Sequence, residues 1–276
     1  MRLVILLIFL SIYLQSKACD CEAPELILEA YNADAVFVGR AIEKVYSKDS
    51  SYYTITFEVV KHYKNLIYPF KRVNVRMVAE GEYSGIYSSC DWHINNRETW
   101  LILGSFYQGE FYFDGYCGNS QTLGPNGISP LQSKVLGQLN EFNILDYQFS
   151  SGNYFEGNSP MIDLDSLSVE FSSLGECQSK ALVFNIDRSG KLTSAYIADQ
   201  SWLSTFEVDS TYLIRSFEAK EPMVPKSKFE EKVIAFANSI KQWTPLSHKK
   251  TGERVSGQVY SLIYCDERGF LKLGRF

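Results

Sequence analysis

The chain has 276 residues, of which 45% are hydrophobic, and its formal net charge is −5. Acidic and basic residues are interspersed, so the sequence lacks the basic stripe that binding to nucleic-acid phosphates requires. Many of the 18 tyrosines and 18 phenylalanines alternate with polar residues, which is typical of β-rich proteins.

The N-terminus predicts export from the cytoplasm. A short basic start precedes the apolar run Leu3–Leu14, and the small residues Ser16 and Ala18 stand before Cys19. This is the pattern of a secretory signal peptide over residues 1–18, because the apolar run is shorter than the roughly 20 residues of a membrane span. In the alternative, Cys19 is the acylated first residue of a bacterial lipoprotein, although Ser16 stands where such proteins usually carry leucine.

Six cysteines follow this segment, namely Cys19, Cys21, Cys90, Cys117, Cys177 and Cys265. An even number of cysteines in an exported chain indicates disulfides, here three. Acylation of Cys19 would leave one thiol without a partner, which favours plain cleavage. Beyond this N-terminal run, the sequence contains no apolar stretch that is long enough to span a membrane. The expected location is therefore secreted, periplasmic or at the cell surface, with a lipid anchor at Cys19 as the alternative.

The first half of the mature chain predicts five strands between two helices. A short helix is expected at Pro24–Tyr31, and an amphipathic helix opens at Ser129 and Pro130 with an apolar face made of Leu131, Val135, Leu139 and Phe142. Runs of β-branched and aromatic residues predict strands at 34–45, 52–62, 72–78, 99–106 and 110–116.

The second half predicts a separate α/β domain. Residues 147–162 are rich in Gly, Ser and Asn without periodicity, so they are interpreted as a linker between domains at 19–146 and 163–276. Beyond the linker the sequence predicts a hairpin of strands 180–186 and 191–198, an amphipathic helix 229–243 and a final strand 258–265. The stretch 199–228 shows no pattern that assigns it.

Several residues of the first domain follow a known family pattern. These are Cys19-Asp20-Cys21-Glu22-Ala23-Pro24, then Ala33-Asp34-Ala35-Val36-Phe37-Val38-Gly39-Arg40, then Cys90 and Cys117. They resemble the netrin-like module, which is the fold of the tissue inhibitors of metalloproteinases. The resemblance implies an all-β, OB-type five-stranded barrel with flanking helices, and it implies the disulfides Cys19–Cys90 and Cys21–Cys117.

The same resemblance implies a function for the mature N-terminus. The α-amine and carbonyl of Cys19 would chelate the catalytic zinc of a metalloprotease, because zinc in such enzymes keeps an open position for ligands of this kind. Asp20 would enter the protease specificity pocket, where the family places threonine or serine, and burying its carboxylate is costly unless it meets a cation. In the alternative, the two bridges only anchor the end of a small barrel, since a fold does not fix a function.

The second domain resembles a different family. Ala181–Leu192, Ala235–Pro245 with its Trp-x-Pro ending, and Gly252 with Val259–Tyr264 resemble the hairpin, helix and last strand of TonB C-terminal domains. The resemblance implies an α+β hairpin-helix-strand module closed by the disulfide Cys177–Cys265. An edge strand of such a module can accept an extended peptide by β-addition, and the expected contacts are Gln258, Tyr260, Ser261 and Ile263. In the alternative, this domain is purely structural.

The sequence predicts that the protein is not an enzyme and has no cofactor or intrinsic metal, because it contains no catalytic or phosphate-binding motif. Asp91 and His93 would suit an acid/base pair, but no nucleophile accompanies them and a surface histidine is the simpler interpretation. We therefore expect an exported, disulfide-bonded binding protein of the bacterial envelope or extracellular space, whose partner is an unidentified protein. The alternative is an inhibitor that contacts a zinc metalloprotease through Cys19 and Asp20.

Overall fold

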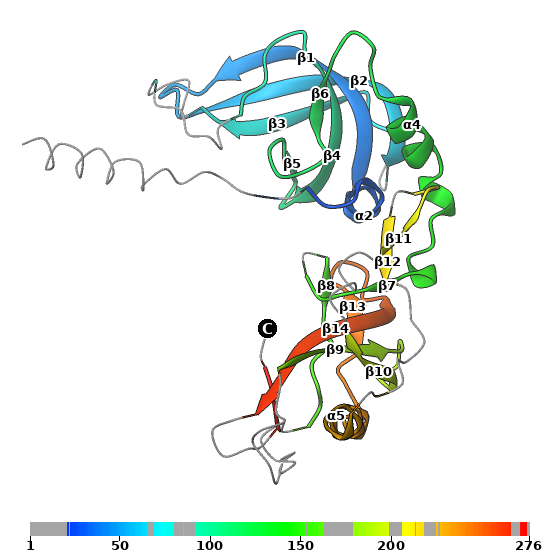
Figure 1. The fold of residues 1–276 in the computed structure, drawn as a ribbon. Helices are drawn as coiled ribbons and strands as arrows, with labels where there is room; N and C mark the ends of the chain where they lie inside the picture. Colours follow the sequence, from blue (N-terminus) through cyan, green and yellow to red (C-terminus); the bar gives the residue numbers. More distant parts are fainter. Residues whose placement is uncertain are drawn as a thin grey trace, which may run out of the picture. The chain divides into compact units, whose positions relative to one another are not determined.

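The computed structural model describes residues 21, 23–65, 69–79, 85, 92–152, 154–162, 179–198, 206–212, 214–217, 225, 227–265 and 271–274. The chain divides into two compact units, Met1–Asn140 and Glu141–Phe276. The first unit is built on a ring-like sheet of five strands, and the second on a seven-stranded, mainly antiparallel sheet with one α-helix among its described residues (Figure 1). The protein is thus mostly β, as its composition predicts.

The strands of the first unit are β1 (Ala35–Tyr46), β2 (Tyr52–Asn65), β3 (Arg72–Val78), β4 (Thr99–Tyr107), β5 (Glu110–Phe113) and β6 (Gln121–Leu123). Their order is β1-β2-β3-β5-β4, and β4 pairs back onto β1, so the five strands form a ring. All of these pairings are antiparallel except the contact of β3 with β5 at Val75 and Phe111. The short β6, which the sequence did not predict, pairs with β4 outside the ring.

The ring closes because β1 pairs with two strands at once. It pairs with β2 over Ala35–Tyr46 and with β4 over Ala35–Arg40. Three register shifts interrupt its ladder with β2, and such bulges bend a strand and increase its twist, as a closed sheet requires. The interior is filled by alternating inward-facing side chains, among them Ala35, Phe37, Tyr53, Ile55, Phe57, Val75, Ile102 and Phe111.

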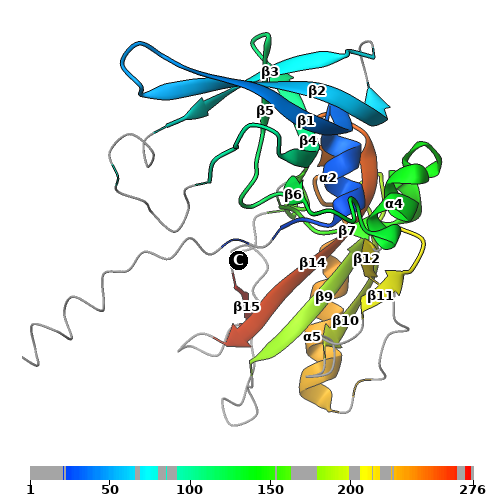
Figure 2. The same cartoon turned by 90° about the horizontal axis from the view of Figure 1, so that it is seen from above.

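Two α-helices lie among the described residues of the first unit. Helix α2 (Leu26–Asn32) buries Ile27 and Ala30 completely, and it contacts α4 (Pro130–Gly137; Figure 2). Helix α4 begins at a capping box in which Ser129 and Gln132 each accept a hydrogen bond from the other's backbone N–H. It ends earlier than predicted, and the 3-10 helices η1 (Leu139–Glu141) and η2 (Ile144–Asp146) follow.

The second unit contains β7 (Gln148–Phe149), β8 (Phe155–Glu156), β9 (Lys180–Ile186), β10 (Leu192–Ala198), β13 (Leu246–His248), β14 (Arg254–Cys265) and β15 (Leu271–Leu273) in one sheet. The main order is β10-β9-β14-β13-β8, while β15 and β7 also pair with β14, β7 in parallel. A separate hairpin, β11 (Phe206–Asp209) and β12 (Ile214–Phe217), lies within the stretch that the sequence leaves unassigned.

Helix α5 (Lys228–Ser239) packs on one face of this sheet. Phe229, Val233, Phe236 and Ala237 of the helix form one core with apolar residues of β9 and β10. Ser227 caps the helix by accepting a hydrogen bond from the Glu230 N–H at 3.2 Å. Hairpin, helix and last strand therefore follow one another as the sequence predicts, with β14 antiparallel to β9.

The segment 147–162 differs from its interpretation as a linker. Its strand β7 pairs with β14, its strand β8 pairs with β13, and Pro160 bridges to Trp243. This segment is therefore part of the sheet of the second unit, and the division between the two units falls at Asn140 and Glu141. Its strands are two residues long and form by pairing with residues about one hundred positions away, so local periodicity does not reveal them.

Several element ends also differ from the prediction, among them those of β5, α5 and β14. Strand β5 stops at Phe113 rather than at residue 116, and α5 stops at Ser239 rather than at residue 243. Beyond the helix, Trp243 is buried and its backbone N–H donates to the Gly190 carbonyl at 2.7 Å, so this tertiary contact replaces a further helical turn. Strand β14 begins at Arg254, earlier than the predicted residue 258, because Arg254–Gly257 pair with β13 and β7.

Candidate functional site

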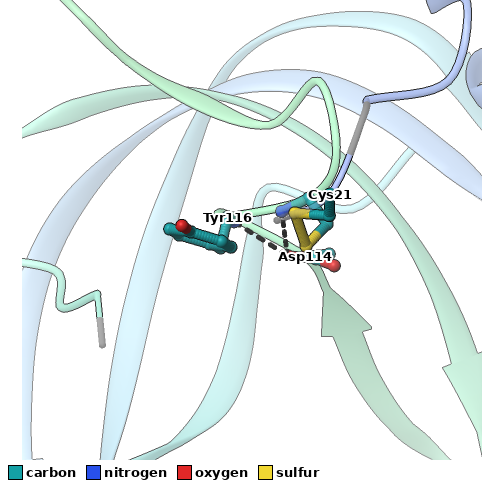
Figure 3. The surroundings of a disulfide bond; sticks show 4 residues. Cys21, Asp114 and Tyr116 are labelled. Atoms are coloured by element: carbon teal, nitrogen blue, oxygen red, sulfur yellow. Dashed lines mark hydrogen bonds between the residues drawn. A yellow bond between two sulfur atoms is a disulfide. The ribbon is translucent and has the colours of Figure 1, made fainter. Parts of the chain in front are cut away.

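Two regions correspond to the sites predicted from the sequence, and the first is the N-terminal anchor. Cys21 and Cys117 form a disulfide with a Cα–Cα distance of 5.6 Å (Figure 3), which confirms one of the three predicted pairings. Cys19, Asp20, Cys90 and Cys177 lie outside the described residues. The pairings Cys19–Cys90 and Cys177–Cys265 and the protease contacts at Cys19 and Asp20 therefore stay predictions.

Asp114 shapes the loop that carries Cys117. Its carboxylate accepts hydrogen bonds from the backbone N–H groups of Tyr116, at 2.7 Å, and Cys117, at 2.9 Å (Figure 3). A carboxylate that binds backbone N–H groups two and three residues ahead turns the chain sharply. This turn ends β5 and presents Cys117 to Cys21.

Asn119 holds the same N-terminal segment from the other side. Its side-chain amide donates to the Pro24 carbonyl at 2.7 Å and to a Glu29 carboxylate oxygen at 2.6 Å, and its backbone N–H donates to that oxygen at 2.7 Å. The segment that follows Cys21 is thus tied to one loop by a covalent bond and by three hydrogen bonds.

Glu29 is the titratable group of this anchor. Burial raises the pKa of Glu29 above its usual value of 4.5, and the nearby Asp114 carboxylate raises it further, whereas the hydrogen bonds from Asn119 lower it. Burial outweighs the hydrogen bonds, so the carboxyl group holds its proton more tightly in the folded protein than in the unfolded chain.

The second region is the side of β14 that faces away from β9. On this side β13 pairs with Arg254 and Val255, β7 with Ser256 and Gly257, and β15 with residues 263–265. The backbone N–H of Gly274 donates to the Leu262 carbonyl at 2.6 Å. None of these described strands pairs with Gln258–Ser261 on this side, which leaves about 14 Å of strand at ~3.4 Å per residue.

A cleft of about 490 Å³ occupies this gap. One wall is Gln258–Ser261 of β14, the opposite wall is the segment 157–160, and Leu273 and Gly274 line it further. Trp243 contributes apolar lining. The volume lies within the range of about 300–1,000 Å³ that is usual for ligand pockets.

The predicted edge residues divide between this cleft and the core. Gln258, Tyr260 and Ser261 line the cleft. Ile263 is completely buried in the core that α5 helps to form, and it pairs with both Lys180 of β9 and Leu273 of β15. It therefore lies outside the stretch that remains open on this side.

Gln258 is fixed by a buried polar network. Its amide donates to Asn185 at 2.8 Å, and the Tyr260 hydroxyl donates to its side-chain oxygen. Gln148 donates to Asn185 and to the Gly257 carbonyl, and Asn185 donates to Ser194. Burial and the nearby Tyr196 raise the pKa of Tyr260, so its hydroxyl is neutral at physiological pH and acts as a donor. A network of this kind holds β7, β9 and β14 in register.

Asn158 is one of the cleft residues that the sequence does not predict. It lies in the segment interpreted as a linker, where no periodicity marks a buried side chain, and only 6% of it is exposed. Its φ of +62° is left-handed, a conformation in which asparagine and glycine are favoured. The Gly157-Asn158 pair was therefore the one local signal for an unusual backbone at this point.

The histidines do not form a common site. His93 is exposed, while Asp91 lies outside the described residues, and His62 and His248 belong to β2 and β13. Within the described ranges no three His, Cys, Asp or Glu side chains gather as a metal site would require. In the same part of the chain no helix is long and apolar enough to cross a membrane.

Comparison with known proteins adds no family to these observations. No protein-family model matches the chain, and the search of curated proteins finds no relative.

Proposed function

We propose that the protein is an exported, disulfide-bonded binding protein that acts by protein–protein contact rather than as an enzyme. The Cys21–Cys117 disulfide supports the export, because such bonds form and persist in oxidising compartments outside the cytoplasm. The cleft beside β14 is the observation that carries the binding function. It lies along a strand whose pairing is interrupted, which is where an extended peptide can be added to a sheet.

The topologies of the two units support the family resemblances behind this proposal. The ring order β1-β2-β3-β5-β4, with β3 and β5 parallel, suits a five-stranded OB-type barrel of the netrin-like kind. The order β10-β9-β14 with α5 on one face suits a TonB C-terminal-like module. Ile263 pairs with Lys180, a register that brings the end of β14 beside the start of β9, as the proposed Cys177–Cys265 bridge needs.

Filling the cleft is expected to weaken peptide binding. Ser159 is exposed at the cleft wall, and its backbone N–H and carbonyl, not its hydroxyl, bind Thr244. Ser159→Trp should therefore block the cleft while the fold is kept. We expect it to weaken binding of a peptide selected from a random ten-residue library by about tenfold or more, measured by calorimetry on the full mature chain.

The matched control is Asn126→Trp, which places the same side chain on an exposed loop of the first unit. This variant should bind the selected peptide as the wild type does. Hydrogen exchange of the complex should show new protection at the amides of residues 258–261. Protection confined to α5, or equal loss of affinity in both variants, would contradict the proposal.

The N-terminal anchor favours a second candidate, the inhibition of a zinc metalloprotease through Cys19. The disulfide at Cys21 and the Asn119 hydrogen bonds to Pro24 and Glu29 fix the chain two residues behind that terminus. If this function holds, one alanine added before Cys19 abolishes inhibition, because it moves the α-amine away from the metal. Asp20→Thr should strengthen inhibition by removing a charge that binding would desolvate.

The measurement is titration of a panel of matrix-type zinc proteases with the authentic and the extended protein. Equal inhibition by both forms would contradict chelation by the Cys19 amine. The absence of inhibition by the authentic form at micromolar concentration would reject this second candidate as a whole.

A further inference from the structure

The side-chain amide of Asn158 is buried without hydrogen bonds. Both its nitrogen and its oxygen are shielded from solvent, and neither has a hydrogen-bond partner within the part of the chain that the structure describes. The backbone N–H of the same residue donates to the Thr244 carbonyl at 2.9 Å. Buried polar groups are rarely left unsatisfied, because each one forfeits its hydrogen bonds to water.

The left-handed backbone at residue 158 explains why an asparagine stands there. It does not explain why the side-chain amide is buried. Asparagine at such a position can turn its side chain to solvent, or glycine can replace it. Here the amide instead lies against the Cα of Gly257, where an added Cβ would stand 2.3 Å from the amide nitrogen and 2.5 Å from the oxygen. Gly257 thus makes the space in which the amide sits, and both residues are needed for this arrangement.

Asn158 lines the cleft at the point where the strand pairing of β14 is interrupted. Gly257 is the last residue of β14 that β7 covers, and Asn158 lines the cleft that begins there. The cleft runs beside Gln258–Ser261 to Leu273 and Gly274. It therefore has the position that an additional strand of this sheet would take.

We propose that the Asn158 side chain turns its amide into this cleft and there binds the main chain of an extended polypeptide segment. An amide offers one N–H donor and one carbonyl acceptor side by side. In an extended chain the N–H and C=O of one residue point to the same side, so a single residue of the ligand satisfies both atoms. Trp243, Val259 and Leu273 give the cleft an apolar lining, which selects an apolar side chain on the ligand face that turns toward them.

This inference rests on the proposed peptide binding and names the residue that performs it. The test uses the free peptide selected from the random ten-residue library and a set of its analogues, each methylated at one backbone nitrogen. Asn158→Gly keeps the left-handed backbone and removes the amide, and Asn158→Asp keeps the shape and removes the donor. We expect each variant of the full mature chain to bind the parent peptide about tenfold or more weakly, because Asn158→Gly loses both hydrogen bonds and Asn158→Asp loses the donated one.

One methylated analogue should lose affinity for the wild type and bind Asn158→Gly no worse than the parent peptide does. Gly257→Ala is a third variant, which should also weaken binding because its Cβ displaces the amide without removing it. An independent readout is the NMR signal of the Asn158 side-chain NH₂ group in the wild type, which should shift when the parent peptide is added.

The outcomes separate the two proposals. Suppose that Ser159→Trp blocks binding of the parent peptide, but that Asn158→Gly binds it with an affinity within twofold of the wild type. The amide then serves only an internal water, and this inference is overturned, while peptide binding in the cleft stands. If no library peptide binds, or if binding is indifferent to Ser159→Trp, the proposed function fails and the inference fails with it.

Discussion

Replacing Cys21 and Cys117 together by alanine is expected to lower the free energy of unfolding by about 4–5 kcal/mol. The two residues are 96 positions apart, and a cross-link that closes a loop of about this length removes a large conformational entropy from the unfolded chain. Cys21 is exposed and Cys117 half-buried, so the alanine side chains themselves forfeit little packing. The loss is therefore assigned to the bridge and not to the removal of sulfur from a core.

The measurement is equilibrium unfolding in guanidinium chloride, followed by tryptophan fluorescence, to which Trp92 and Trp100 of the first unit contribute. The single variants Cys21→Ala and Cys117→Ala are the controls, because each breaks the same bond and should lose nearly as much stability as the double variant. A decrease below about 1 kcal/mol, well under the usual range for a native disulfide, would mean that other contacts already hold the segment.

The ring of the first unit could be predicted because its strands carry their signal locally. Strand β3 begins and ends where the alternation of Val73, Val75 and Met77 places it, and β2 and β4 differ from prediction only at their C-terminal ends. The end of β5 was missed because the Asp114 side chain, and not a change in hydrophobicity, turns the chain there. Such a turn depends on a hydrogen bond that competes with the strand.

The cleft could be predicted only in part. The apolar pattern of the last strand indicated Gln258–Tyr264, and three of the four predicted contacts do line the cleft. The opposite wall, with Asn158, comes from a polar segment whose two-residue strands exist only through pairing with β13 and β14. Pairing between distant residues leaves no periodicity in a short polar segment, so a linker was the interpretation that local rules favoured.

Ile263 shows why an edge cannot be assigned from one strand alone. Its place in an apolar strand suggests a peptide contact. In the structure, however, β15 pairs with Ile263 on the side of β14 that faces away from β9. Leu271–Leu273 is a strand of only three residues, and its pairing with β14 decides which part of β14 stays open. Sequence patterns identify strands more readily than they identify the neighbours of each strand.

Asn119→Ala is expected to destabilise the protein by about 2–4 kcal/mol at neutral pH. The change removes one hydrogen bond to the Pro24 carbonyl and one to the Glu29 carboxylate, and bonds to charged groups contribute more than neutral ones. The backbone bond from residue 119 to Glu29 remains, so the carboxylate keeps one donor. Denaturant unfolding at several pH values measures the effect.

The pH dependence of this loss has a definite sign. Burial already raises the pKa of Glu29 in the folded protein, and Asn119 counteracts it, so Asn119→Ala should raise that pKa further. A carboxyl group whose folded pKa lies above its unfolded value favours folding when protonated, and this contribution is lost as the pH rises through the folded pKa. In Asn119→Ala the folded pKa of Glu29 is higher, so its stabilising contribution continues to fall up to a higher pH than in the wild type. The difference in stability between wild type and variant should therefore grow from acidic to neutral pH.

Asn95→Ala is the matched control, since Asn95 donates to Glu98 through the same kind of side-chain bond at 2.7 Å but at an exposed position. Solvent replaces such a bond at little cost, so this variant should lose less than about 1 kcal/mol. NMR titration of the Glu29 side-chain carboxyl carbon in the wild type and in Asn119→Ala measures the pKa directly. An unchanged Glu29 pKa together with a pH-independent loss of stability would show that Asn119 acts through Pro24 alone, and the N-terminal segment would then be held by its backbone contact rather than by the buried carboxylate.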